Sequence, residues 1–475
     1  MFEPGEARRA KASPREGWQE GGDAKSMHKH AQSRVPAVPE KARQGTEALG
    51  RDWSWVEASV WTERMLAALD KGVLGGKWFS LMDKVYRAGT LQAAWERVAS
   101  NQGAAGVDGQ SVRRFELRAE AYLEELEQGL KSGTYRPQPV KRVEIAKGGG
   151  KTRPLGIPVV KDRIVQTALK MVIEPIFEHQ FRGHSYGFRP GRGCKDALRE
   201  VDRLIKAGYT QVVDADLAGY FDSIPKAGLL QRVKASISDG GVLSLIEAFL
   251  EQDVVKGLAR WTPASGTPQG AVISPLLANL YLHPLDCLLE QRGYRMVRYA
   301  DDFVVMCASA EQAQAALSEV KAWVQAHGLS LNADKTHVGD CMQAGEGFEF
   351  LGYRFEAGTR SVRRKSSAAL REKIRTRTKR SRSGSLRTMI EELNPMLRGW
   401  FNYFKHISPA AEFFQRIDGF VRRRLRAILC RRNHRPHQFG RNLWASKKWP
   451  NAFLARQGLF TLVPAHAAAS QSRCG

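Results

Sequence analysis

Two adjacent carboxylates, Asp301 and Asp302, stand between two short runs of β-forming residues at 296–299 and 303–306. This pattern predicts a β-hairpin with both acids at its turn. Carboxylates held side by side among apolar residues repel each other and resist ionisation unless a cation neutralises them. Oxygen ligands of this kind are what Mg²⁺ prefers, so the pair is a candidate magnesium site. The alternative is a solvated turn with no chemistry.

A second pair of acids, Asp214 and Asp216, lies within the strand-like run 212–217. Because they are two residues apart, they share one face of that strand. Phosphoryl transfer with two metal ions needs carboxylates that converge from separate strands. Asp216 facing the hairpin turn would provide this arrangement. We interpret Asp214 and Asp222 as structural, with one facing the exterior of the sheet and the other capping the next turn.

The elements that would hold these acids alternate between strand and helix from about residue 140 to residue 355. The strand-like runs are interleaved with helical patterns at 164–177 and 313–327. No GxGxxG or GxxxxGKS loop accompanies them, which argues against the usual parallel nucleotide-binding sheets. The sequence therefore predicts an α+β fold.

The flanking segments differ in composition. Residues 1–52 hold few large apolar side chains, so we expect a disordered extension. Residues 53–134 show apolar residues at helical spacing, which predicts a helical lead-in. Residues 363–387 contain eleven Lys or Arg and one acid, Glu372, in a chain whose formal net charge is +25. A second basic run, at 422–432, alternates with apolar residues, so we predict helices with a phosphate-binding face.

The cysteines and the hydropathy pattern indicate the compartment. The six cysteines are scattered and form no CxxC pair, which is typical of a reducing compartment. No run of about 18 apolar residues is present, so we expect no membrane span and a cytoplasmic, nucleoid-associated bacterial protein. Cys430, His434 and His437 lie close in the sequence but have no fourth ligand nearby, so we do not favour a zinc site there.

Seven sequence blocks occur in an order that resembles the successive blocks of reverse transcriptases. Two further segments narrow the resemblance, because 101–109 (NQGAAGVDG) is similar to the extra N-terminal block of group II intron-encoded reverse transcriptases and 394–404 (NPMLRGWFNYF) to their maturase thumb. The resemblance covers about residues 53–462. The seven blocks are 153–158 (RPLGIP), 185–190 (SYGFRP), 216–222 (DLAGYFD), 266–270 (GTPQG) with 274–280 (SPLLANL), 299–302 (YADD), 331–335 (LNADK) and 350–353 (FLGY).

The resemblance implies a right-hand polymerase fold. Fingers and palm, with an antiparallel sheet and helices, would occupy 135–358, and a helical thumb or maturase domain would occupy 359–450, followed by a tail at 451–475. The implied activity is RNA-directed DNA polymerisation, joined to binding of the parent intron RNA for splicing and mobility.

The same resemblance assigns the acids. Asp216, Asp301 and Asp302 would be catalytic and, with the backbone carbonyl of Leu217, would bind two Mg²⁺ ions. Such ions activate the primer 3′-hydroxyl and steady the triphosphate and the departing pyrophosphate.

Four residues match family positions that contact the incoming dNTP. Phe221 would lie below the sugar and exclude a 2′-hydroxyl. Lys147 and Arg153, which flank a run of three glycines, would grip the triphosphate through charge-assisted hydrogen bonds. Gln269 would contact the nascent base pair. From the residues alone, Phe221 could equally be a core aromatic and the glycine-rich stretch a flexible basic turn.

The basic helices would bind RNA phosphates, which gives affinity but little sequence readout. We predict that the aromatic residues at 400–404 form thumb core rather than a base-stacking platform. The expected partners are group II intron RNA, an RNA template with a DNA primer, dNTPs and target DNA, and a homodimer is left open. The residues expected to contact RNA are Arg363, Arg364, Lys365, Arg371, Arg375, Arg422, Arg423 and Arg424.

Two departures from the family pattern matter. Ala218 stands where many members have Lys, so we expect a helper charge near the template to be absent. The sequence ends at Gly475 without the paired cysteines of a zinc-containing HNH endonuclease, so it resembles the bacterial type that lacks this domain, and we expect no second-strand cleavage. Three alternatives stay open: a splicing cofactor with a vestigial polymerase site, a domesticated reverse transcriptase in repair or phage defence, and an RNA-dependent RNA polymerase, which Phe221 disfavours.

Overall fold

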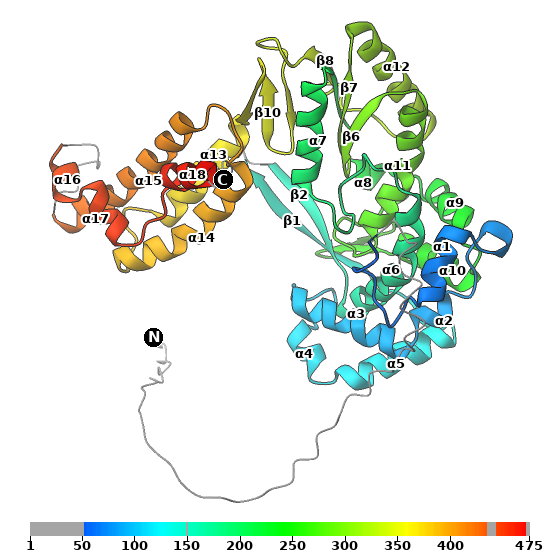
Figure 1. The fold of residues 1–475 in the computed structure, drawn as a ribbon. Helices are drawn as coiled ribbons and strands as arrows, with labels where there is room; N and C mark the ends of the chain where they lie inside the picture. The colour runs from blue at the N-terminus through cyan, green and yellow to red at the C-terminus, as the bar shows by residue number, and fades with distance from the viewer. Residues whose placement is uncertain (1–51, 149–150, 435–442, 472–475) are drawn as a thin grey trace, which may run out of the picture. The chain divides into compact units, whose positions relative to one another are not determined.

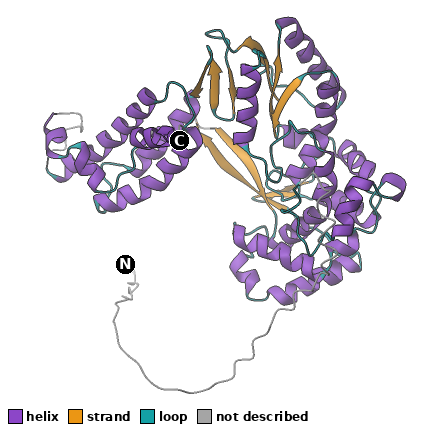
Figure 2. Cartoon of the chain, in the orientation of Figure 1, coloured by secondary structure: helices purple, strands orange, loops and turns teal. Residues whose placement is uncertain are grey.

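The computed structural model describes residues 52–148, 151–434 and 443–471 (Figure 1). The predicted disordered extension therefore lies outside the described residues, except for its last residue, as does His437. The described chain combines many helices with three separate β-sheets, as Figure 2 shows. This is the α+β architecture that the alternating pattern predicts.

The segment before the first strand is helical, because its apolar residues recur every three or four positions. In α3, for example, Leu91, Trp95 and Val98 share one buried face. Side-chain caps start two of these helices: Thr62 accepts a hydrogen bond from the Met65 amide. The elements are α1 (Glu63–Lys71), the 3₁₀ turn η2 (Leu74–Gly76), α2 (Met82–Val85), α3 (Ala88–Asn101), α4 (Val112–Glu116) and α5 (Ala119–Lys131), with Ser111 capping α4.

The first sheet has the strand order β2-β1-β4-β5. Strands β1 and β2 form the hairpin around the glycine-rich stretch and pair antiparallel, as do β4 and β5. The prediction of an antiparallel sheet is wrong for one pairing, because Val140 of β1 pairs with Val254 of β4 in parallel. More than a hundred residues separate these two strands, so the chain can return in either direction. The bounds are β1 (Val140–Gly148), β2 (Lys151–Ile157), β4 (Val254–Lys256) and β5 (Ala259–Trp261).

The second sheet, which we call the palm sheet, has the order β6-β7-β3-β8 and is antiparallel throughout. Its central strands are buried on both faces. Helix α12 packs against β3, β7 and β8, and α7 packs against β6 and β7. The strands predicted around the acids are confirmed. The bounds are β3 (Gln211–Asp216), β6 (Arg295–Tyr299), β7 (Asp302–Cys307), β8 (His337–Asp340), α7 (Cys194–Lys206) and α12 (Ala310–Ala326).

Two long helices run through the centre of this region. Helix α6 (Val160–Gln180) is buried on almost every side, and α11 (Ser274–Gln291) is buried along most of its length. Their buried residues are not all apolar, because α6 buries Asp162, Arg163, Gln166 and Glu174, and α11 buries Asn279 and Asp286. The shorter helices of this region are α8 (Tyr220–Ser223), α9 (Lys226–Ser236) and α10 (Gly240–Leu250).

The chain after the palm forms a small sheet and a set of helices that share one hydrophobic core. The aromatic cluster is confirmed as thumb core: Phe401 and Phe404 are buried, and Trp400 and Tyr403 pack against them. The elements are β9 (Phe348–Phe350), β10 (Tyr353–Glu356), β11 (Thr359–Val362), α13 (Arg364–Arg377), α14 (Leu386–Phe404), α15 (Ala411–Arg432), α16 (Leu443–Lys448), α17 (Asn451–Arg456) and α18 (Leu462–Gln471).

The segment after residue 450 is not a tail, and that prediction is wrong. Leu454 and Leu462 are fully buried in the same core. The carboxylate of Asp418 accepts hydrogen bonds from the amides of Leu462 at 2.9 Å and Val463 at 3.1 Å, which fixes the start of α18 on α15. Six large apolar residues lie between 453 and 463, and those that are buried hold this segment in the core.

Two observations bear on the compartment. The five cysteines within the described residues are all free thiols. Among the described helices, none combines the length and the hydropathy that crossing a bilayer requires.

A buried carboxyl at the start of α6 leads to a prediction about stability. Asp162 is 1% exposed and accepts hydrogen bonds from Tyr135 Oη at 2.6 Å, the Gln138 amide at 3.0 Å and Gln252 Nε2 at 2.9 Å. Burial raises its pKa to about 7 in spite of these donors. The folded protein therefore holds this proton far more tightly than an unfolded chain, in which the pKa is about 3.9.

The contribution of this group to stability is fully present below about pH 4 and is lost as the pH rises through about 7. Asp162→Asn cannot titrate at this position. We therefore expect its free energy of unfolding to depend less on pH than that of the wild type, by a few kcal/mol at most across that window. Urea unfolding midpoints between pH 5 and pH 8 measure it. Glu125→Gln is the control, since Glu125 pairs with Lys161 in the same region but is 63% exposed. An unchanged slope in Asp162→Asn would contradict the assignment.

Candidate active site

The register of the palm sheet brings the predicted acids together. Asp216, the last residue of β3, pairs directly with Asp302, the first residue of β7. Strands β6 and β7 pair from Tyr299 and Asp302 onward, so Ala300 and Asp301 form the turn of the hairpin. The predicted hairpin with acids at its turn is confirmed. Carboxylates from two strands thus meet at one end of the sheet.

The end of β3 is held in place by the segment 330–336, which belongs to one of the seven sequence blocks. The Asn332 amide donates to the Asp216 carbonyl at 2.8 Å. Leu217, whose carbonyl was expected to join the metal site, is buried and bridges Leu331. The ammonium of Lys335 donates to Asp216 Oδ2 at 2.7 Å. No role was expected for Lys335, although its place in the LNADK block was a signal.

The electrostatics of the site are those of crowded acids. Burial and, after it, the negative charges of Asp214, Asp301 and Asp216 together raise the pKa of Asp302 to about 7, against the opposing charge of Arg363. The expectation that Asp214 faces the exterior is wrong, since Asp214 is 9% exposed. Its pKa is raised to about 6, chiefly by burial and against the opposing effect of His337. Asp214 therefore adds to the negative potential at Asp302.

The donor set fits a divalent cation that keeps part of its water shell. Crowded carboxylates of raised pKa are stabilised by a nearby cation, and carboxylate oxygens are hard ligands suited to Mg²⁺. Within the described part of the chain, no group of three acidic, histidine or cysteine side chains is arranged to hold a metal ion by itself. An open set is what Mg²⁺ uses when substrate phosphates and water complete its coordination. Lys335 meanwhile neutralises Asp216.

The residues expected to meet the nucleotide lie on α8 and on the turn that contacts it. Phe221 is half-buried, and its ring lies edge-on to Phe188 with the centroids 6.4 Å apart. Its carbonyl accepts a hydrogen bond from the Thr267 amide at 2.7 Å, which ties α8 to the GTPQG turn. Gln269 Nε2 donates to Asp222 Oδ2 at 3.0 Å. Asp222 lies inside α8 and holds this glutamine, so the interpretation of Asp222 as a cap is wrong.

The glycine-rich hairpin is joined to the same turn. The Gly156 amide of β2 donates to the Gln269 carbonyl. A cavity of about 300 Å³ lies where these elements meet, and Arg142 and Trp261 line it together with Asp222 and Gln269. Arg153 is exposed on β2, opposite Ile145 of β1. The side chain of Lys147 lies outside the described residues, so its expected contact stays a prediction.

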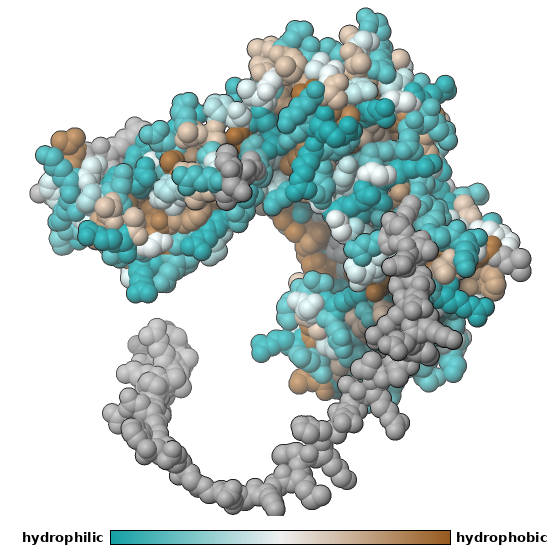
Figure 3. Space-filling view, in the orientation of Figure 1, coloured by the Kyte–Doolittle hydropathy of each residue, from teal (hydrophilic) through white to brown (hydrophobic). Residues whose placement is uncertain are grey.

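The residues expected to bind RNA divide into two groups. Arg364 and Lys365 are exposed at the start of α13, and Arg371 lies over the ring of Phe420, 5.2 Å from its centroid. Arg375 lies over the same ring at 5.7 Å. Hydrophilic residues predominate over the C-terminal helices on the face shown in Figure 3. These side chains are available to a polyanion.

Other basic residues of this set have structural partners. Arg424 donates to Thr378 Oγ1 at 3.1 Å and to the Thr378 carbonyl at 2.6 Å, so it caps the end of α13. Arg426, from the same basic run, is buried and donates to the Trp449 carbonyl at 2.9 Å. Arg363 lies 4.0 Å from Glu349, and its side chain is 35% exposed. Arg422 and Arg423 are half-exposed on α15.

Cys430 packs in a small apolar cluster with Ala445 and Trp449. Its thiol is fully buried. Packing accounts for this cysteine without a ligand.

Comparison with known families agrees with this geometry. Residues 145–355 match the family described as reverse transcriptase (RNA-dependent DNA polymerase). Residues 367–452 match the group II intron, maturase-specific domain. The first match contains the acids and the residues expected to contact the nucleotide, and the second contains most of the basic C-terminal helices.

Individual relatives support the same grouping. Protein YkfC of Escherichia coli (strain K12) is 35% identical over 289 residues, which are 52% of this chain and 75% of YkfC. The group II intron-encoded protein LtrA of Lactococcus lactis subsp. cremoris is 39% identical over 201 residues, 42% of this chain and 33% of LtrA. Nuclear intron maturase 1 of Arabidopsis thaliana is 32% identical over 113 residues, 24% of this chain and 16% of that protein. The matched part of the chain spans a third of LtrA. Together, the two domain matches and these relatives show that the chain belongs to the reverse transcriptase and maturase family of group II introns.

Proposed function

We propose that this chain copies RNA into DNA at a site made by Asp216, Asp301 and Asp302 with two Mg²⁺ ions, and that its maturase domain binds group II intron RNA to promote splicing and mobility. The observation that carries the proposal is the pairing of Asp216 with Asp302 across β3 and β7. It supports metal-dependent phosphoryl transfer, because such chemistry needs carboxylates from separate strands at one point.

Membership of the family sets the coarser features. Reverse transcriptase domains use divalent metal ions, and the two domains together imply nucleic acid partners. We extend this to an RNA template with a DNA primer, dNTPs, the intron RNA and target DNA. Bound Mg²⁺ would lower the pKa of the primer 3′-hydroxyl and neutralise the triphosphate. A cytoplasmic, nucleoid-associated location and a homodimer stay predictions.

The chain's own side chains then mainly hold and orient the reactants. Asp216, Asp301 and Asp302 present the metal-facing oxygens, with the Leu217 carbonyl beside them. Arg153 and Lys147 would hold the triphosphate, as the resemblance implies. Gln269, fixed by Asp222, would contact the nascent base pair. In such a site, positioning and charge stabilisation account for most of the rate enhancement.

Primer extension tests the polymerase half of the proposal. The purified chain is given a DNA primer on an RNA template with Mg²⁺ and either dNTPs or NTPs. We expect full-length DNA product with dNTPs. Preference for NTPs would point to an RNA polymerase instead, and the absence of any product, with intron RNA still bound, would favour a splicing cofactor with a vestigial site.

The maturase half is tested by the salt dependence of RNA binding. Replacing the exposed residues Arg364 and Lys365 and the half-buried Arg371 with alanine removes three charges from α13. We expect the slope of log K against log salt to fall in magnitude by about two, because each phosphate contact releases roughly 0.7 counterions from single-stranded nucleic acid. Filter binding of intron RNA between roughly 50 and 300 mM KCl measures the slope.

The matched control is Arg387→Ala with Arg416→Ala. Both arginines are exposed on neighbouring helices but pair with a glutamate four residues away. We expect this control to keep the wild-type slope. An unchanged slope in the α13 variant would place the RNA elsewhere. Wild-type binding to unrelated RNA with equal affinity would favour a domesticated enzyme without an intron.

A further inference from the structure

The proposed chemistry assigns no role to two of the sequence segments that carry the family resemblance, SYGFRP at 185–190 and SPLLANL at 274–280. It also leaves an arginine with no access to solvent. Arg298 lies on β6, two residues before the hairpin turn, and is 0% exposed. Burying a guanidinium is costly unless every donor is satisfied by partners of good geometry. Its partners therefore indicate what the residue is for.

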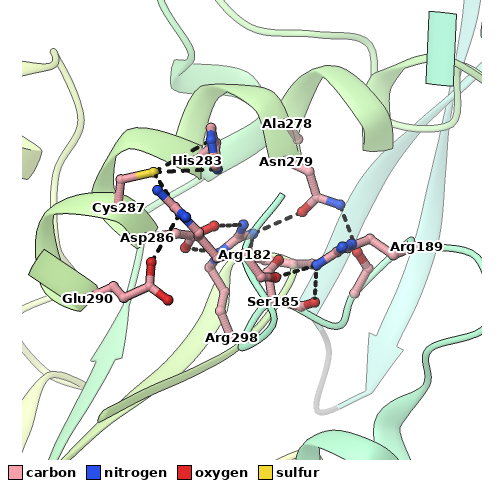
Figure 4. Close-up of polar contacts among 12 residues, drawn as sticks. Arg182, Ser185, Arg189, Ala278, Asn279, His283, Asp286, Cys287, Glu290 and Arg298 are labelled. Atoms are coloured by element: carbon pink, nitrogen blue, oxygen red, sulfur yellow. Dashed lines mark hydrogen bonds and ion pairs between the residues drawn. The ribbon is translucent and has the colours of Figure 1, made fainter. Parts of the chain in front are cut away.

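Arg298 is held by Asp286 and Asn279 of α11, as Figure 4 shows. It also binds the turn of the β6–β7 hairpin. Its Nε and Nη2 donate to the two carboxylate oxygens of Asp286 at 2.7 and 2.5 Å, and both side chains are 0% exposed. Its Nη1 donates to Asn279 Oδ1 at 2.9 Å. The same nitrogen donates to the carbonyl of Ala300 at 2.9 Å. The planar guanidinium of Arg298 is thus fixed by the side chains of α11 and also bound to the hairpin turn.

Ala300 needs such a restraint. Its φ is +61°, a left-handed conformation that alanine adopts rarely, and it directly precedes Asp301. A rotation of the peptide after Ala300 would redirect both carboxylates that follow. Strained backbone of this kind persists only where its surroundings over-determine it. The hydrogen bond from Arg298 supplies one such restraint.

The loop 184–189 supplies the other restraint from the opposite side. The Arg298 amide donates to the His184 carbonyl at 3.0 Å, and the Tyr186 amide donates to the Arg298 carbonyl at 2.8 Å. Asn279 Nδ2 donates to the Gly187 carbonyl at 2.7 Å. A Cβ on Gly187 would lie 2.2 Å from the Ala300 nitrogen, so only glycine fits there. Arg189 Nη1 closes the loop through the Ser185 carbonyl at 2.7 Å.

We propose that Arg298, locked by Asp286 and Asn279, is a positioning residue that sets the backbone of the Ala300–Asp301 turn and thereby the direction of the metal-binding carboxylates. The inference rests on the proposed function for its effect on polymerisation. Its claim about the turn is independent of that function. Residues that orient metal ligands from behind alter metal affinity or activity by about 10–100-fold when removed. Arg298 touches no reactant and acts through the turn alone.

The decisive variant is the double substitution Arg298→Met with Asp286→Leu. Removing both charges leaves no uncompensated ion in the core, and such exchanges are often neutral for stability. The tether to Ala300 is lost. We expect the Mg²⁺ concentration for half-maximal extension to rise by about tenfold and kcat to fall by about 10–100-fold, with the KM for dNTP changed less than about threefold. Hydrogen exchange of the peptide spanning 297–304 in the metal-free protein should quicken by about tenfold.

A second variant and a control separate positioning from general stability. Arg298→Lys keeps the charge beside Asp286 but cannot span the three partners, so we expect the same faster exchange at the turn. Arg426→Gln is the control: Arg426 is equally a buried arginine, bound to the Trp449 carbonyl and to Asn451 at 2.8 Å, but far from the turn in sequence. It should lower the urea midpoint and leave the exchange at 297–304 and the Mg²⁺ midpoint unchanged.

The outcomes are distinct. If the double variant folds and keeps wild-type exchange at 297–304, Arg298 does not restrain the turn and the inference is overturned. The same holds if exchange quickens while the Mg²⁺ midpoint stays at the wild-type value in an active enzyme. A wild-type protein that extends no primer would refute the proposed function instead, and the exchange measurement would still decide whether Arg298 holds the turn.

Discussion

Primer extension on an RNA template by Asp301→Ala, and separately by Asp302→Ala, should fall by at least about 10³-fold in kcat/KM. Each substitution removes an oxygen ligand from a site in which positive charge must offset the triphosphate. A loss of three decades corresponds to about 4 kcal/mol of transition-state stabilisation, which is the scale that charge stabilisation provides in such sites. Product formation per unit time at saturating dNTP and at limiting dNTP measures both constants.

The binding of template should survive these substitutions. The basic surface that would hold RNA is on α13 and α15, and removing a carboxylate lowers the negative charge near the template. We therefore expect the affinity for primer and template to stay equal or to rise slightly. Asp83→Ala is the matched control, since Asp83 is a half-exposed acid of the helical lead-in. Equal product from wild type and both variants would leave the proposed site without support.

The acid site could be predicted because its causes are local. Alternation of apolar residues defines the strands on either side of Asp301, and a period of two places Asp216 on a known face of β3. The order of the blocks then restricts how the strands pair. The structure bears this out in the register of β3 with β7. A short-range pattern and one long-range strand pairing are enough to predict that these acids lie together.

Partners of charged residues could not be predicted in the same way. Lys335 meets Asp216 from a segment 119 residues further along the chain. Arg424 was expected to face phosphates, but it caps α13, 46 residues earlier. A basic side chain looks the same in sequence whether it faces solvent or satisfies a buried carbonyl. Only the fold decides which, because the choice depends on what packs beside it.

Arg298 shows the same limit within the most informative stretch of the sequence. It occurs in RYADD, next to the acids, where a basic residue suggests contact with phosphate. The structure gives it Asp286 and Asn279 as partners and no exposure. Both partners lie on α11, a largely apolar helix whose polar residues an apolar pattern leaves unexplained. Polar residues inside an apolar helix therefore mark the buried networks that periodicity cannot resolve.

Phe221→Ala should weaken the preference for dNTPs over NTPs by about 10²-fold in the ratio of kcat/KM values. Phe221 is only half-buried, so part of its ring is accessible, whereas its neighbour Tyr220 is 2% exposed and donates to the Ala278 carbonyl. A plain core aromatic would be covered as Tyr220 is. The ring is also braced from the side by Phe188, whose own ring is 45% exposed. An accessible, braced ring can exclude a hydroxyl by contact.

The expected change arises on the ribonucleotide side. Removing the ring opens space for a 2′-hydroxyl, so kcat/KM for NTPs should rise while that for dNTPs falls only modestly. Phe221→Tyr is the matched control, because it keeps the ring and should keep the discrimination. Single-nucleotide incorporation opposite each template base, with matched dNTP and NTP, measures the ratio. If Phe221→Ala loses activity toward both substrates equally, the ring supports α8 and sugar selection must come from another contact.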